Sequence, residues 1–126
     1  MHINDQKRLV YKVTFHLIHL LPASSHPTLK KLINKIKIAG EADLRLIKAA
    51  IVNEFTLCSV YYKIEDQAFI DALYNLSTLG NSYRSADIIH ELAEITSFPE
   101  DQVEKKWELM MGQEHDTQKV QAHVVE

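Results

Sequence analysis

The sequence predicts an all-α protein of about six helices that form a single domain. Apolar residues recur three and four positions apart along most of the chain, which is the period of an amphipathic helix. Glycine and proline number only three each, too few for the hairpin turns of an all-β fold. The length of 126 residues and the hydrophobic content of 46% suit one core.

The first predicted helix covers residues 5–21. Val10, Val13 and Leu17 keep the helical spacing, and Pro22 ends the segment. Apolar and polar residues also alternate within 9–20, so a strand is the alternative there. The length of the segment favours the helix.

A second helix is predicted over 27–39, with its most regular part at 29–38. Pro27 suits a first helical turn, and Gly40 is the expected residue just after the helix. Lysines occupy the side away from the apolar stripe, which makes this the clearest amphipathic segment of the chain.

The third and fourth helices are predicted at 44–57 and 66–78. Acidic residues open both segments, as the positive end of the helix dipole favours. The third helix has an open boundary, because residues 57–62 are rich in aromatic and β-branched side chains. Gly80 is the expected stop of the fourth.

The fifth and sixth helices are predicted at 87–95 and 100–110. Ser85 is the expected N-cap of the fifth helix, and Ser97 with Glu100 forms the pattern of a capping box for the sixth. Gly112 is the expected end. We therefore assign residues 1–112 to the domain and 113–126 to a polar, flexible tail.

Nine apolar residues at helical spacing are the predicted core. They are Leu32, Ile36, Ile47, Ile51, Phe55, Phe69, Leu73, Leu92 and Val103.

Charge is divided unevenly along the chain. Residues 1–40 carry seven basic residues and one acid, a net charge of +6, whereas residues 41–126 carry a net charge of −9. Such asymmetry indicates either a charged partner or packing of basic helices beside acidic ones within the fold.

Two charged helix surfaces are the candidate partner-binding sites. The second helix presents lysines but no arginine and no interleaved aromatic residue, and a solvated face is the plainer interpretation. The sixth helix presents acids. The candidate residues are Lys30, Lys31, Lys35, Lys37, Glu100, Asp101, Glu104 and Glu108.

The segment from Ala86 to Met111 resembles a helix-turn-helix. Small residues at Ala93 and Ser97 and the branched Val103 stand at that motif's spacing. Ser97 replaces the glycine that usually occupies the turn. The helix that would face DNA carries mostly acids, which repel phosphate, so an ordinary helical hairpin is the preferred interpretation.

Catalytic and metal-binding signatures are weak. His16 and His19 share a helix side and could bind a metal with His2 or His26, but a partly buried histidine pair is the plainer interpretation. Cys58 has no histidine nearby in sequence. We predict no catalytic residue, no metal and no cofactor.

These observations favour a small non-catalytic interaction protein, such as a regulator, adaptor or inhibitor that docks on a larger protein. The alternative is a nucleic-acid-binding regulator that uses the lysines of 27–39 or the 86–111 hairpin. No apolar run is long enough for a membrane span and no secretory signal is evident, so we expect a cytoplasmic protein. The identity of the partner and the oligomeric state stay open.

Overall fold

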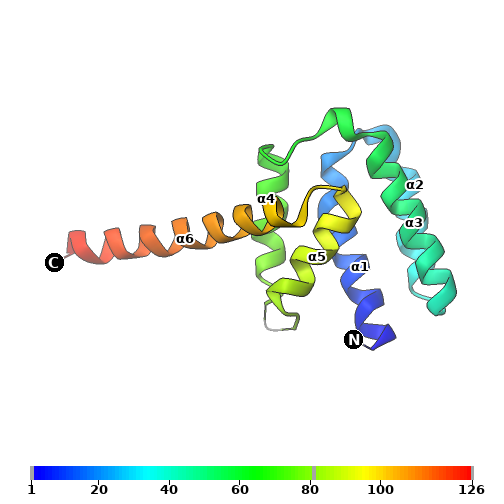
Figure 1. Ribbon diagram of the computed structural model, residues 1–126, viewed down its shortest axis with the longest axis horizontal. Helices are drawn as coiled ribbons and strands as arrows, with labels where there is room; N and C mark the ends of the chain where they lie inside the picture. Colours follow the sequence, from blue (N-terminus) through cyan, green and yellow to red (C-terminus); the bar gives the residue numbers. More distant parts are fainter. Residues whose placement is uncertain (1, 81, 126) are drawn as a thin grey trace.

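Six α-helices build the part of the chain that the structure describes, and no strand occurs there (Figure 1). The computed structural model describes the backbone of residues 2–80 and 82–125 and the side chains of 2–80 and 82–112. The helices are α1 (Ile3–Leu17), α2 (His26–Ile36), α3 (Glu41–Leu57), α4 (Gln67–Ser77), α5 (Ser85–Thr96) and α6 (Glu100–Val125). Short 3-10 turns lie at Ile18–Leu20, Ala23–Ser25 and Ser59–Tyr61. The predicted all-α fold is confirmed, and the first segment is a helix.

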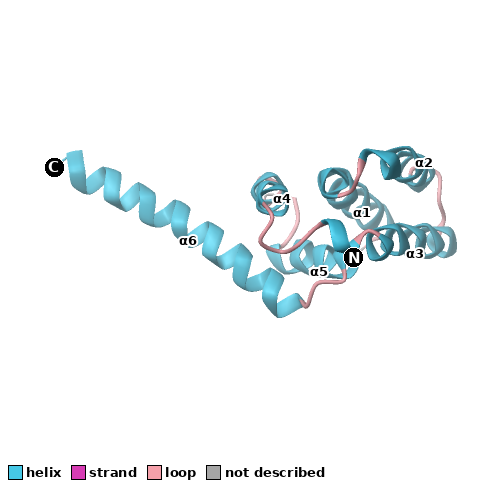
Figure 2. Cartoon of the chain, turned by 90° about the horizontal axis from the view of Figure 1, so that it is seen from above, coloured by secondary structure: helices cyan, strands magenta, loops and turns pink. Residues whose placement is uncertain are grey.

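Helix α1 is the centre of the bundle, in contact with α2, α3, α4 and α5. Leu9, Val10, Val13 and Leu17 are buried and fall on one side of this helix. Seen from above, α2 and α3 lie side by side at one end of the molecule, with α4 and α6 toward the other (Figure 2). None of the described helices is both long and apolar enough for a membrane span.

Four aromatic rings join the distant parts of the core. Phe55 of α3, Tyr62, Phe69 of α4 and Phe98 pack edge to face, with ring centroids 5.2 to 6.0 Å apart. The Tyr62 hydroxyl donates to the carbonyl oxygens of Phe55 and Thr96, each 3.0 Å away. Burial and the neighbouring Cys58 raise the pKa of Tyr62 to about 12, so the hydroxyl keeps its proton at neutral pH.

Seven of the nine predicted core residues are buried, whereas Leu32 and Ile47 are only half-buried. These two residues lie on α2 and α3, the helices at one end of the molecule (Figure 2). A helix at the edge of a bundle contacts fewer neighbouring helices than a central one, so a smaller part of its surface is covered. The residues at the margin of its apolar stripe therefore stay partly exposed to solvent.

Several predicted helix boundaries are wrong. Helix α1 ends at Leu17 and not at residue 21, because a 3-10 turn follows it at Ile18–Leu20. Helix α2 ends at Ile36, and Gly40 instead caps the start of α3, where its carbonyl accepts from the Leu44 amide at 2.8 Å. Arg84, not Ser85, is the N-cap of α5. Helix α6 continues through Gly112 to Val125, because one glycine costs a helix only about 1 kcal/mol. The division into a domain and a flexible tail at 112 stays a prediction.

The α5–α6 turn differs from the predicted capping box. Ser97 closes α5 in the left-handed conformation, with φ 64° and ψ 17°. The Thr96 hydroxyl oxygen accepts from the Phe98 amide at 3.3 Å, and the Pro99 carbonyl oxygen accepts from the Gln102 and Val103 amides in the first turn of α6. Ser97 therefore takes the backbone conformation that favours glycine at this place in a helix-turn-helix.

Replacing Ser97 by glycine is expected to raise the free energy of unfolding by about 0.5–1 kcal/mol. A β-carbon in the left-handed region costs roughly 1–2 kcal/mol, part of which is offset by the greater freedom of glycine in the unfolded chain. Urea unfolding measures the change. Ser97→Ala keeps the β-carbon and is the control; an equal gain in both variants would show that strain at this residue is not the cause.

Candidate functional site

The lysines and the arginine of the first 40 positions form no ion pair with the acids whose side chains the structure describes. Among the described residues, none of them lies within 4.0 Å of a carboxylate oxygen. Glu41, a nearby acid, pairs with Arg45 at 3.9 Å. Neutralisation of the basic helices by acidic helices within the fold, the second explanation of the charge asymmetry, therefore has no support in the described ion pairs.

A groove of about 450 Å³ lies between the first half of α1 and the end of α2. We call it the basic groove. Four of its lining residues are cationic and none is acidic. The lining consists of Asn4, Lys7, Arg8, Tyr11, Lys12, Ile36 and Lys37.

Two contacts hold the end of α2 against α1 and set the shape of the basic groove. The Lys7 ammonium donates to the carbonyl oxygen of Lys37 at 3.0 Å. The Lys37 ammonium lies 5.7 Å from the centroid of the Tyr11 ring, within the range of a cation–π interaction. Both ammonium groups keep further N–H donors for a ligand.

An aromatic pair continues from the groove along α1. The rings of Tyr11 and Phe15 are parallel to within 5°, with centroids 6.4 Å apart. Phe15 is 51% exposed, which is high for a large apolar side chain. Lys7, Tyr11 and Phe15 stand four positions apart, so they share a side of α1. This four-residue spacing in the sequence could have indicated a cationic and aromatic surface on α1. The prediction instead placed the binding surface on the lysines of α2.

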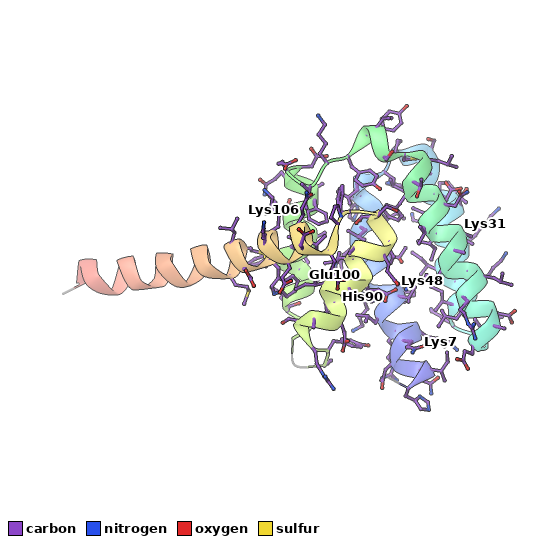
Figure 3. All side chains as sticks on the ribbon, viewed as in Figure 1. Lys7, Lys31, Lys48, His90, Glu100 and Lys106 are labelled. Carbon is purple, nitrogen blue, oxygen red and sulfur yellow. The ribbon has the colours of Figure 1, made fainter. Side chains whose placement is uncertain are left out.

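The predicted lysines are all exposed, but the structure divides them. Lys37 lines the basic groove with the cations of α1. Lys30, Lys31 and Lys35 lie outside the groove on α2, and we call these three the lysine row. Figure 3 shows Lys7 and Lys31 on the α1–α2 side of the molecule.

The predicted acidic residues are also exposed and lie on α6, away from the lysines. Glu100 lies 3.3 Å from the Nδ1 atom of His90 on α5 (Figure 3). Asp101, Glu104 and Glu108 point to solvent, while Val103 and Trp107 on the same helix are buried. The α5–α6 hairpin thus has a buried apolar side and an acidic outer face.

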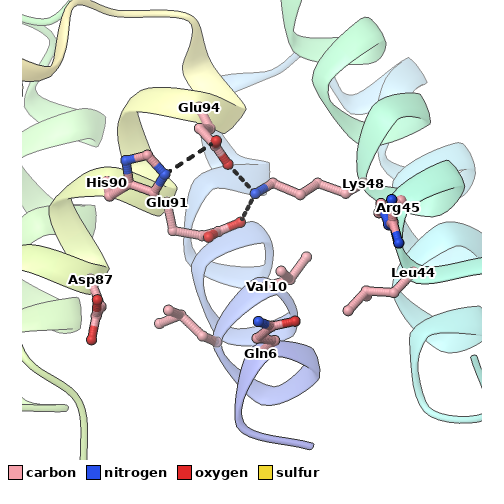
Figure 4. A pocket seen from close by; sticks show the side chains of 10 residues that line it. Gln6, Val10, Leu44, Arg45, Lys48, Asp87, His90, Glu91 and Glu94 are labelled. Atoms are coloured by element: carbon pink, nitrogen blue, oxygen red, sulfur yellow. Dashed lines mark hydrogen bonds and ion pairs between the residues drawn. The ribbon is translucent and has the colours of Figure 1, made fainter. Parts of the chain in front are cut away.

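A second cavity, of about 340 Å³, is lined by α1, α3 and α5 (Figure 4). Lys48 of α3 lies 2.6 Å from Glu91 and pairs also with Glu94, and His90 lies 3.2 Å from Glu94. Burial alone would lower the pKa of Lys48, but the hydrogen bonds and charges of both glutamates outweigh it and raise that pKa. Burial would raise the pKa of Glu94, but Lys48 and His90 lower it.

The charges in this second cavity largely satisfy one another. We call Lys48, His90, Glu91, Glu94 and Glu100 the ion-pair network; it ties α3 to α5 and α5 to the start of α6. The sequence gives no sign of this network, because 46 positions separate Lys48 from Glu94.

The histidines do not form a metal site in the described part of the chain. No group of three His, Cys, Asp or Glu side chains is placed there to hold a metal ion. The His19 and His26 rings meet edge to face at 6.4 Å, and His26 Nε2 lies 3.0 Å from the Leu21 carbonyl oxygen. Burial, with His19 and Lys12 nearby, lowers the pKa of His16, which favours its neutral form. Cys58 is half-buried, with its Sγ 3.5 Å from the Ser25 hydroxyl.

Comparison with protein-family models, curated proteins and solved structures found no match for this chain.

Proposed function

We propose that this is a small non-catalytic binding protein that docks on a larger anionic partner through the basic groove and the lysine row. The supporting observation is the set of seven basic side chains on α1, α2 and the turn after α2 that have no carboxylate within 4.0 Å among the described residues. Like charges held together repel one another, and an anionic surface that approaches them relieves that repulsion.

The ion-pair network is a less suitable docking site. Its lysine is engaged by two glutamates, and its remaining groups are mostly acidic. The acidic outer face of α6 would repel the phosphates of duplex DNA. The α5–α6 hairpin therefore lies outside the proposed docking surface, which is on the α1–α2 side of the molecule.

Reversing the charge of Lys31 and Lys35 to glutamate is expected to slow association with a polyanion by on the order of tenfold at low salt. Peripheral charges act mainly on the rate of encounter, and salt screens their effect. Both side chains are exposed, so the free energy of unfolding should change by no more than about 0.5 kcal/mol. Stopped-flow association with poly-L-glutamate and with single-stranded oligothymidine measures the rates, and thermal melting checks the fold.

Lys63→Glu with Lys105→Glu is the matched control, because it makes the same charge change at exposed lysines elsewhere. The control should retain a larger share of the original rate. Equal rates in both double variants would remove the lysine row from the interface. Failure of the unaltered protein to bind either polyanion at low salt would contradict the proposed function as a whole.

A further inference from the structure

We infer that the basic groove binds single-stranded nucleic acid, with bases stacked on Tyr11 and Phe15 and phosphates held by the cations around them. This inference rests on the proposed function and names the chemistry of its partner. The structure brings Lys37, at the end of α2, beside the aromatic pair and the cations of α1.

The geometry of the two rings suits nucleobases. Tyr11 and Phe15 are parallel to within 5°, with centroids 6.4 Å apart, so the two rings present flat surfaces of the same orientation along α1. A base can stack on an exposed ring face, and such stacking tolerates every base because each has a π-face. The 51% exposure of Phe15 leaves much of its surface open to such a ligand.

The cations are placed to hold a backbone beside those rings. Lys7, Arg8 and Lys12 are on the same helix as the aromatic pair, and Lys37 lies against Tyr11 from the other side of the groove. Three of these four cations are lysines, which bind phosphate as point charges without the paired geometry that arginine requires. The groove lining contains no carboxylate that would repel phosphate.

Two other polyanions fit the groove less well. An acidic protein segment would use the cations but has no bases to place on the parallel rings. Duplex DNA hides its base faces within the helical stack, so Tyr11 and Phe15 could reach them only by unstacking the duplex, which costs a few kcal/mol. A single strand offers phosphates and free base faces together.

The direct test compares single-stranded oligothymidine of about ten nucleotides, the same strand without bases, the matching duplex and poly-L-glutamate. Fluorescence anisotropy at low salt gives each Kd. We expect oligothymidine to bind about tenfold or more tightly than the abasic strand, since stacking contributes about 1–3 kcal/mol per base. This comparison uses the unaltered protein and requires no variant to fold.

Two variants then separate stacking from charge. Tyr11→Ala with Phe15→Ala should weaken oligothymidine binding to the level of the abasic strand, and should leave poly-L-glutamate binding unchanged. Arg8→Gln with Lys12→Gln should flatten the dependence of log Kd on log salt by about 1.4, the value for two lost phosphate contacts on a single strand. Tyr61→Ala with Tyr74→Ala removes exposed aromatic rings elsewhere and should have no effect on binding.

The outcomes distinguish the inference from the proposed function. Equal affinity for oligothymidine and the abasic strand would overturn the inference, because the bases would then contribute nothing to binding. If the double variant Arg8→Gln with Lys12→Gln still weakened binding in that case, an acidic protein would remain as the proposed partner. Duplex affinity equal to that of the single strand would also overturn it. If no polyanion binds, the inference and the proposed function are both wrong.

Discussion

Truncation of Phe55 to alanine is expected to lower the free energy of unfolding by about 3–5 kcal/mol. Phe55 has no exposed surface, and its ring packs edge to face against Tyr62 with centroids 6.0 Å apart. Tyr62 in turn contacts Phe98, which contacts Phe69, so a cavity at Phe55 would open beside the ring cluster that joins α3, α4 and the α5–α6 turn. Urea unfolding followed by circular dichroism measures the loss.

Phe15→Ala is the matched control, because it makes the same truncation at a half-exposed ring outside the core. We expect a change of no more than about 0.5 kcal/mol there. A loss below about 1 kcal/mol at Phe55 would contradict its place at the centre of the core. A small change in this control would also establish that the fold is kept when Phe15 is removed in the binding experiments.

Replacement of Lys48 by methionine is expected to lower the free energy of unfolding by about 2 kcal/mol. The change leaves Glu91, which is only 8% exposed, without the ammonium that lies 2.6 Å from it. Removing one partner of a fully buried ion pair costs about 3–5 kcal/mol, and the partial exposure of Lys48 reduces that figure. Thermal and urea unfolding measure the effect.

The double variant Lys48→Met with Glu91→Gln tests the cause. Because no unpaired charge remains buried at position 91, it should recover part of the stability that Lys48→Met loses. No recovery would indicate that the lysine stabilises the fold through the packing of its aliphatic stem rather than through its charge.

The contribution of the ion-pair network to the free energy of unfolding should decrease at both low and high pH. The pKa of Glu94 is lowered in the folded state, so its stabilisation is present above the ordinary value of 4.5 and is lost as pH falls through the lowered pKa. The pKa of Lys48 is raised, so its stabilisation is present below 10.5 and is lost as pH rises through the raised pKa. The difference in melting temperature between the original protein and Lys48→Met should therefore narrow at both extremes. If the difference in melting temperature stayed the same from below pH 4.5 to above pH 10.5, this electrostatic account would be wrong.

The fold was largely predictable because helical periodicity is a local property of the chain. Each helix is marked by apolar residues that return to one side, and that pattern also places Lys30, Lys31 and Lys35 of α2 on the exposed side. Helix ends were less predictable. Ser97 and Glu100 have the residue types of a capping box, yet they do not form one. Packing of α6 against α5 holds Ser97 in the left-handed conformation, and the Glu100 carboxylate contacts the His90 ring instead.

The sequence by itself thus determined the all-α class, the positions of the helices and the exposure of the lysine row. Only the tertiary structure decided that Lys37 lies over Tyr11 at the basic groove and that Lys48 lies between Glu91 and Glu94. The physical reason is that the period of a helix records which side is buried but not which helix lies against it. That choice follows from how all six helices fill one core together, and it places cations and aromatic rings from separate segments side by side.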